Sequence, residues 1–238
     1  MRKRSFLLTT GLLASGLTPL ALASPATAAT AKFVDDFNGD GHRDVVFGDG
    51  TATVGGKKQA GAVVVVWGTA RGPAVAVKRS LITQNTPYIA GTAETNDFFG
   101  TKVTAADMSK GGYGDLGVGV PRSGKGGALH ILKGTSAGPS TTVTSINQTT
   151  TGVPGTPESA DYFGYDVSAA DMNGDGCPDL AAGVPGQVLG ESLCYGGVAT
   201  LLRGSKSGLT GKNSRQFDVR TPGVDGDPAQ ANTSSHRR

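Results

Sequence analysis

The stretch Asp36-Phe37-Asn38-Gly39-Asp40-Gly41-His42-Arg43-Asp44 decides the fold, because an acidic nonapeptide of this form occurs again further along the chain. It returns as Asp171-Met172-Asn173-Gly174-Asp175-Gly176-Cys177-Pro178-Asp179. An altered copy lies between them, at Asp107-Met108-Ser109-Lys110-Gly111-Gly112-Tyr113-Gly114-Asp115. The first positions of successive copies are 71 and 64 residues apart. The nonapeptide therefore belongs to a larger repeating unit.

Each unit also contains short apolar, often β-branched runs bounded by glycine. The clearest runs are residues 61–68, 127–134 and 197–204. A more polar run follows each of them, at 75–83, 141–148 and 215–219. Runs of this length and composition predict strands rather than helices. Several short strands in each repeating unit indicate the blades of a β-propeller.

The sequence around the acidic loops resembles the FG-GAP repeat. Phe99-Gly100 and Phe163-Gly164 precede the second and third loops, and Gly-Val-Pro turns follow at 119–121 and 183–185. This repeat forms the blades of the integrin α-subunit propeller and of many exported bacterial proteins. The resemblance covers about residues 32–225. It implies an exported bacterial protein with an all-β fold of three four-stranded blades, in which each acidic loop joins the first two strands and binds structural calcium.

The repeat divides the chain into predicted segments. The three blades are expected at 29–96, 97–160 and 161–225, between a leader (1–28) and a tail (226–238) that begins a further blade or is disordered. Propellers of this family usually have about seven blades, so three blades predict an incomplete ring. The spacing of Phe99 and Phe163 places a further Phe-Gly pair near residue 230, where none occurs. We expect a truncated gene product, or alternatively an arc that another chain completes.

Oxygen-bearing residues at fixed loop positions predict calcium sites. Positions 1, 3, 5 and 9 carry carboxylates or an amide, and position 7 contributes a backbone carbonyl. Ca²⁺ prefers such hard oxygen ligands in a short loop. The predicted ligands are Asp36, Asn38, Asp40, His42 and Asp44 in the first loop, and Asp171, Asn173, Asp175, Cys177 and Asp179 in the third, His42 and Cys177 acting through their carbonyls. The alternative is a polar turn without metal.

The second loop has fewer ligands than the other two. It keeps Asp107 and Asp115, but Ser109 stands at position 3 and a glycine at position 5, and Lys110 adds a positive charge. We predict a weak or lost site there. An EF-hand is excluded, since position 12 of the intact loops is Phe47 or Ala182 instead of an acidic ligand.

The ends and the charge indicate an exported protein. Arg2-Lys3-Arg4, the apolar stretch 6–23 and the small residues Ala26-Thr27-Ala28 have the form of a signal peptide, with a retained lipophilic anchor as the alternative. Three of the 22 Lys and Arg lie in this leader and none of the 19 Asp and Glu does, so the mature chain carries no net charge. A neutral chain gives no indication of nucleic-acid binding. No later segment is apolar enough to span a membrane.

The two cysteines lie in the third unit. In an exported protein, Cys177 and Cys194 are expected to form a disulfide, with two buried thiols as the alternative.

A catalytic reading finds little support. Residues 134–138 match the Gly-x-Ser-x-Gly pattern of serine hydrolases, but the equivalent segments 68–72 and 204–208 lack the central serine. The pattern therefore indicates a turn, and we lean against an enzyme. The sequence predicts a secreted or cell-surface, calcium-binding propeller module for adhesion or for binding a protein or glycan. The alternatives are the non-catalytic propeller of a secreted hydrolase (phospholipase D-like or esterase), and a structural arc within a larger surface assembly.

Overall fold

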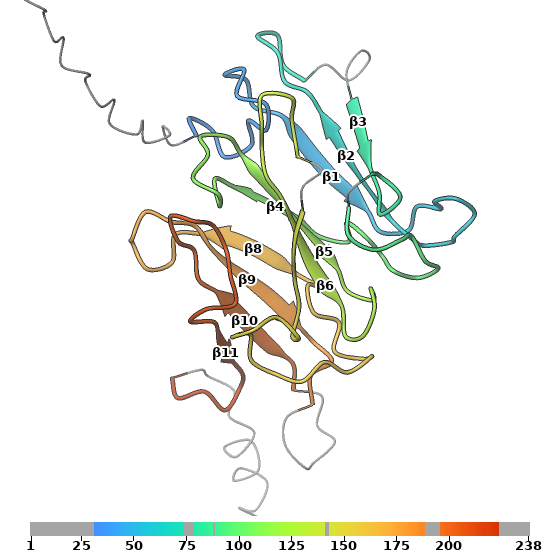
Figure 1. Cartoon of the computed structure of the whole chain (residues 1–238), viewed down its shortest axis with the longest axis vertical. Helices are drawn as coiled ribbons and strands as arrows, with labels where there is room; N and C mark the ends of the chain where they lie inside the picture. The colour runs from blue at the N-terminus through green and yellow to red at the C-terminus, as the bar shows by residue number, and fades with distance from the viewer. Residues whose placement is uncertain (1–30, 74–78, 88, 141–142, 189–195, 224–238) are drawn as a thin grey trace, which may run out of the picture.

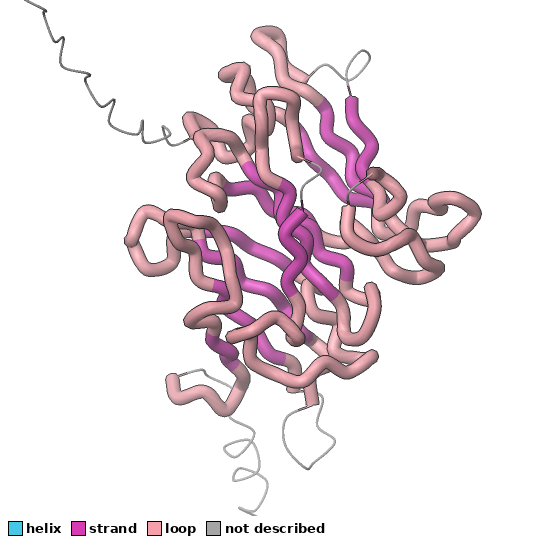
Figure 2. The backbone as a smooth tube through the Cα atoms, in the orientation of Figure 1, coloured by secondary structure: helices cyan, strands magenta, loops and turns pink. Residues whose placement is uncertain are grey.

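The computed structural model describes residues 31–73, 79–87, 89–140, 143–188 and 196–223 (Figure 1). These residues form β-strands and loops without any helix (Figure 2), which confirms the predicted all-β class. The strands are β1 (Val45–Asp49), β2 (Ala62–Val66), β3 (Arg79–Ile82), β4 (Val103–Ala106), β5 (Asp115–Val120), β6 (Ala128–Leu132), β7 (Val143–Ile146), β8 (Val167–Ala170), β9 (Asp179–Val184), β10 (Val198–Leu202) and β11 (Arg215–Phe217). A helix long and apolar enough to cross a membrane does not occur in the described part. The predicted leader and tail lie outside it.

The second and third units each form a four-stranded antiparallel sheet, as the repeat predicts. Strands β4 to β7 pair in chain order, and so do strands β8 to β11. The registers are also equivalent, because Leu116 pairs with Leu132 in one sheet and Leu180 with Leu202 in the other. Each sheet is thus one blade of a propeller arc, and the described residues do not close a ring (Figure 1).

The first unit differs, because its described part forms a three-stranded sheet, β1-β2-β3. Residues 32–35, which correspond to β4 and β8, form bends and turns. In the other units, the Phe-Gly pair anchors this strand to the preceding blade. The equivalent residues of the first unit are Ala28 and Ala29, which lie outside the described part.

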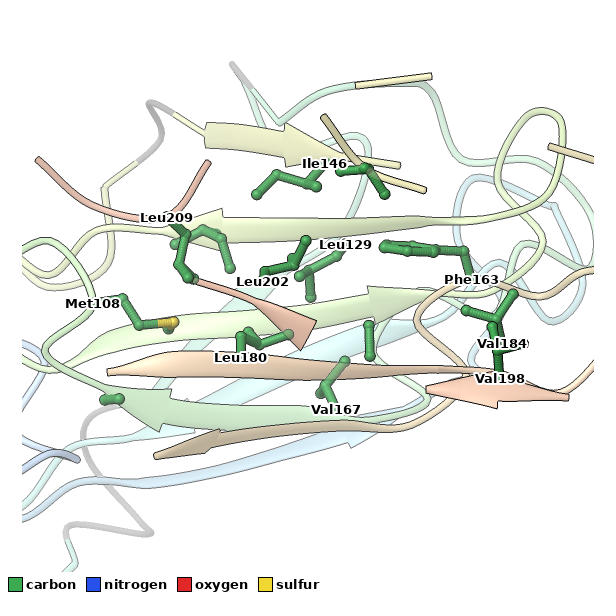
Figure 3. Close-up of a cluster of buried hydrophobic side chains, with 14 residues drawn as sticks. Met108, Leu129, Ile146, Phe163, Val167, Leu180, Val184, Val198, Leu202 and Leu209 are labelled. Atoms are coloured by element: carbon green, nitrogen blue, oxygen red, sulfur yellow. The ribbon is translucent and has the colours of Figure 1, made fainter. Parts of the chain in front are cut away.

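The core lies between the blades, since each sheet packs face to face on the next. One cluster joins the first and second blades, with Val63, Val65 and Ile82 on one side and Leu116 and Val118 on the other. A second cluster joins the second and third blades (Figure 3). Its largest members are Met108, Leu129, Ile146, Phe163, Leu180 and Leu202. Alternate residues of a strand point to opposite faces, so an inner blade contributes to both clusters.

The Phe-Gly pairs fix how consecutive blades meet. The N–H of Phe99 donates to the carbonyl of Ala60 at 2.9 Å, and Phe99 forms an isolated parallel bridge with Gly61. Phe163 forms the same bridge with Gly127, and both phenylalanines are fully buried. Replacing such a side chain by alanine typically costs about 3–5 kcal/mol.

The glycine of the pair is required by close packing. Gly100 has a φ of +78°, and a Cβ atom there would lie 2.6 Å from Val63 Cγ2 and 2.8 Å from the carbonyl oxygen of Ala62. A larger residue would therefore be strained and would push the blades apart.

His130 lies in β6 between the first two blades. Its ring centroid is 6.2 Å from that of Phe99, and neither ring nitrogen has a hydrogen-bond partner among the described residues. Burial lowers the pKa of His130 to about 4 from its ordinary value of 6.5. The imidazole is therefore neutral in the folded protein near pH 7.

We predict that His130 makes the fold sensitive to mild acid. Between about pH 4 and 6.5 the unfolded chain binds a proton that the folded chain rejects, so the free energy of unfolding falls as the pH falls. From pH 7 to pH 5 the loss due to His130 should be about 2 kcal/mol. His130→Val, which introduces the residue found at the equivalent Val64, should remove this part of the loss. Urea unfolding at both pH values measures it.

An equal acid sensitivity in wild type and His130→Val would contradict the assignment.

Candidate calcium loops and recognition cleft

The first and third acidic loops have the same internal hydrogen bonds. Asp36 Oδ1 accepts the N–H groups of Gly39 and Asp40 at 2.7 and 3.2 Å, and its Oδ2 accepts that of Gly41 at 2.9 Å. In the third loop, Asp171 accepts the equivalent three N–H groups at 2.8, 3.2 and 2.8 Å. The side chain at position 1 therefore organises the loop backbone in both copies.

Positions 3 and 5 also match. The Asn38 side chain donates to Asp40 Oδ2 at 3.0 Å, and its oxygen accepts the Asp40 N–H at 3.0 Å. Asn173 and Asp175 form the same two bonds, both at 2.9 Å. The N–H of Cys177 donates to Asp175, and this bond lowers the pKa of Asp175, which favours the ionised carboxylate. The Asn–Asp pair is thus held in the same way in both loops.

The aspartate at position 9 connects the loop to the blade in all three units. The buried Asp44 accepts the N–H of Gly68, the residue two positions after β2, at 2.7 Å. Asp115 accepts the N–H of Gly134, and Asp179 accepts that of Gly204, both at 2.8 Å. Burial raises the pKa of Asp44 and of Asp115 above the usual value, and the accepted N–H bonds oppose that rise. Position 9 is therefore a structural latch whether or not its loop keeps the other ligands.

The second loop has a different arrangement. Asp107 accepts the N–H groups of Ala31 and Gly112 through Oδ2, while its buried Oδ1 has no partner among the described residues. Lys110 extends to the third loop, where its Nζ donates to the carbonyl of Gly176 at 2.6 Å. The acidic loops of the second and third blades are thus in direct contact through the charged side chain of Lys110.

The donor chemistry of the first and third loops fits calcium. Each combines three carboxylates and an amide on a backbone with left-handed glycines, Gly41 and Gly176 having φ values of +85° and +80°. In the described part of the chain, no three His, Cys, Asp or Glu side chains converge as a metal cluster. The carboxylates turn toward backbone N–H groups instead. A cation would have to draw them together, and calcium coordination stays a prediction.

The third loop differs from the first at its latch. Arg203 Nη1 donates to Asp179 Oδ2 at 2.8 Å, and this carboxylate is fully buried. Trp67 stands at the position equivalent to Arg203 in the first unit. Asp179 is therefore already neutralised by a side chain, whereas Asp44 accepts only backbone N–H groups in the described contacts.

The disulfide prediction falls partly outside the described residues. Cys177 is buried and carries a free thiol in the structure. Cys194 lies in the segment 189–195, which is not described. The pairing of Cys177 with Cys194 stays a prediction.

The Gly-x-Ser-x-Gly segment is a turn, as its repetition predicted. The N–H of Gly138 donates to the carbonyl of Thr135 at 2.7 Å. The equivalent bonds join Gly72 to Thr69 at 2.9 Å and Gly208 to Ser205 at 3.0 Å. The same turn therefore forms with or without a central serine.

A cleft at the other end of the strands was not predicted. It is lined by Gly50, Thr51, Phe98, Thr101, Pro121, Arg122, Tyr162 and Tyr165. The Arg122 guanidinium carbon lies 5.4 Å from the Phe98 ring centroid and 5.1 Å from that of Tyr162. Cation–π contact on two sides orients an exposed arginine.

Phe98 and Tyr162 have unusual backbone conformations. Their φ values are +59° and +57°, in the left-handed region that bulky residues rarely adopt. Strain of this kind concentrates at binding sites. The sequence signal was the repeated aromatic doublet before glycine, Phe98-Phe99 and Tyr162-Phe163, of which only the second member was recognised.

Comparison with known proteins places this architecture in a family. The FG-GAP repeat model matches residues 163–202. The phosphatidylinositol-glycan-specific phospholipase D of Bos taurus is 34% identical over 114 residues, which are 46% of this chain and 14% of the enzyme. Integrin alpha-PS5 of Drosophila melanogaster is 30% identical over 154 residues, or 64% of this chain and 14% of the integrin. Integrin alpha-3 of Cricetulus griseus is 30% identical over 142 residues, covering 51% and 12%.

The stacked antiparallel blades define a protein of the β-propeller repeat class. The family model, matched in the third blade, and the integrin relatives support an FG-GAP repeat protein. It spans about one seventh of the length of these relatives.

We predict that Asp115 stabilises the second blade independently of calcium. Asp115→Ala leaves the N–H groups of Gly134 and Ser109 without their acceptor, which should cost about 2–6 kcal/mol because each unpaired group costs about 1–3 kcal/mol. The loss of unfolding free energy should be equal in calcium and in chelator. The exposed Asp40→Ala is the contrast, since its effect should appear in calcium alone. A calcium-dependent effect of Asp115→Ala would contradict the latch.

Proposed function

We propose that this chain is an exported, calcium-stabilised propeller module. It would bind a protein or glycan ligand as a secreted protein or at the cell surface. The observation that carries the proposal is the matched hydrogen bonding of the first and third loops, which holds equivalent oxygen ligands in equivalent places. The similarity to integrin α chains supports a binding role. Residues 1–28, which have the form of a signal peptide, support export.

Calcium would stabilise the fold by relieving repulsion among the loop carboxylates. Asp36, Asn38 and Asp40, with the carbonyl of His42, would hold it in the first loop, and Asp171, Asn173 and Asp175, with the carbonyl of Cys177, in the third. The position-9 aspartates would contribute a remaining lone pair, because each Oδ atom can accept more than one partner. The bound ion would hold the acidic loop, which connects the first two strands of its blade, in one conformation.

The two loops should differ in affinity. In the third loop, Lys110 lies on the Gly176 carbonyl and Arg203 pairs with Asp179, so two cations already offset its negative charge. In the described part of the chain Asp44 has no such pair, although Arg43 pairs with the neighbouring Asp35 at 2.9 Å. We therefore expect tighter binding in the first loop, and none of comparable strength in the second.

Calcium removal should lower the thermal midpoint of unfolding. A ligand that binds only the folded state stabilises it by about 2.7 kcal/mol at a hundredfold excess over its Kd. Isothermal titration should find two unequal sites. Asp40→Ala should remove the tighter one and Asp175→Ala the weaker one, while Ser109→Ala should leave both unchanged.

Three equal sites, or a melting curve that chelation does not shift, would overturn the calcium proposal. Magnesium at the same concentration is a useful comparison, because its smaller octahedral shell suits this loop less well.

Ligand recognition is assigned to the cleft around Arg122. The loops and the cleft lie at opposite ends of β5, which begins at Asp115 and ends just before Pro121 and Arg122. A calcium-fixed loop would thus stabilise the blade from one end while the other end stays free for a ligand. A preoriented guanidinium between aromatic rings suits a ligand with a carboxylate and a flat or sugar-like body.

We predict that Arg122→Ala weakens ligand capture about tenfold or more, since a charge-assisted hydrogen bond contributes about 1.5–3 kcal/mol. The probes are a glycan array rich in uronic and sialic acids and an array of acidic peptides. Lys125→Ala removes the same charge from the same exposed loop and should have little effect. Equal losses in both variants would indicate general electrostatics instead of the cleft.

The second candidate function is the non-catalytic propeller of a secreted hydrolase. The similarity to the Bos taurus phospholipase D specifically favours it, although the match covers a small part of that enzyme. In that case the glycan array should give binding to glycosylphosphatidylinositol glycans. The Cys177–Cys194 disulfide belongs to the same export proposal, and mass spectrometry of the unreduced secreted chain would test it.

A further inference from the structure

At each end of the described arc, one blade has a face on which no other described blade packs. Each blade has a front face, which packs on the preceding blade, and a back face, on which the next blade packs. The front faces of the second and third blades carry fully buried residues, Leu116 and Val118 in one and Leu180 and Ala182 in the other. The first blade has no preceding blade in the described residues, and the third has no following one.

The front face of the first blade is apolar and open. Phe47 is 50% exposed, whereas Val118 and Ala182 at the equivalent positions are fully buried. Val45 and Leu81 are exposed beside it. Together these side chains border a groove that is lined by Phe47, Val64, Val66, Arg79, Ser80 and Leu81.

The back face of the third blade is also open. Ala199 is exposed where Val63 and Leu129 are fully buried in the other blades. Phe217 is 38% exposed, whereas the equivalent Ile146 is 1% exposed. This face also carries small residues, with Gly183 and Gly197 lining a shallow groove beside Ala199. Large side chains thus project from the front face of the first blade, whereas Ala199, Gly183 and Gly197 leave space beside Phe217 on the back face of the third.

We propose that a second copy of this chain packs its open back face on the open front face of the first. The described blades of two copies would number six, within the range of about four to eight that closed propellers have. The contact is head-to-tail, so two such contacts close the ring and bury both kinds of open face. This proposal is independent of the calcium loops and of the Arg122 cleft.

Continuity with the internal interfaces favours this occupant. The same back-to-front contact occurs between the first and second blades and between the second and third. The turn that follows β6 packs on the preceding blade, whereas the equivalent turn after β2 of the first blade has no such neighbour in the described residues. A Cβ on Gly138 would lie 2.2 Å from the Trp67 ring of the preceding blade, while one on Gly72, in the same conformation, would meet nothing within 4 Å.

Other features make the new contact weaker than the internal ones. Asp49 stands where Val120 and Val184 are buried, and no Phe-Gly pair precedes the first loop. Arg79 and Arg215 occupy the positions of Val143 and Ser80, which places two cations at the rim. Association should therefore depend on protein concentration, and moderate salt should strengthen it by screening the arginines.

The test is the mass of the purified chain in solution. Light scattering after size exclusion, with sedimentation velocity over a concentration series, should show a monomer–dimer equilibrium. Phe47→Asp at the front face and Ala199→Arg at the back face should each prevent ring closure and leave mostly monomer. Ala137→Arg is the matched control, because Arg71 occupies this turn position in the first blade, and it should dimerise like wild type. Thermal unfolding of every variant checks that the blades stay folded.

Mixing the two face variants gives the sharpest result. Phe47→Asp keeps an intact back face and Ala199→Arg an intact front face, so the mixture should form a one-contact dimer that neither variant forms alone. A monomeric wild type at all concentrations would overturn the proposal. Dimerisation that is lost in Phe47→Asp but kept in Ala199→Arg would also overturn it, because it would show front-to-front contact.

Discussion

The stacking of each blade on its predecessor is the constraint on which the rest of this structure depends. A small four-stranded sheet has two apolar faces and cannot bury both alone. Phe99 and Phe163 solve this by crossing to the preceding blade, where each forms a bridge with a glycine and is fully buried. Because the glycine after each phenylalanine lies against the neighbouring backbone, the spacing between blades tolerates little change. This contact therefore determines where the acidic loops, the Arg122 cleft and the two open faces lie.

The acidic loops combine a structural role with the proposed calcium-binding role in one motif. Position 9 connects each loop to the glycine two residues after the next strand, and this connection is present in all three units. Positions 3 and 5 have no such role, because their bonds stay inside the loop. This explains why the second loop keeps Asp115 after losing an acid at position 5. The loss of its ligands leaves the blade intact.

The acidic loops and the Arg122 cleft lie at opposite ends of the strands. One end carries the carboxylates and the other the arginine between aromatic rings, so that each can change without disturbing the other. Relatives as different as integrin α chains and a phospholipase D share the repeat. This diversity agrees with a scaffold whose exposed loops, rather than its core, determine what it binds.

The sequence by itself determined the strands, the blade repeat, the paired loops and the turn character of residues 134–138, because these depend on local spacing and on periodicity that recurs along the chain. The tertiary structure alone decided which oxygens accept backbone N–H groups, and that Lys110 and Arg203 offset the charge of the third loop. It also brought Arg122 between Phe98 and Tyr162, residues up to 40 positions distant. It left Phe47 exposed where Val118 is buried. The contacts of Lys110 with Gly176 and of Arg122 with Tyr162 join different blades, and no pattern within one repeat can specify them.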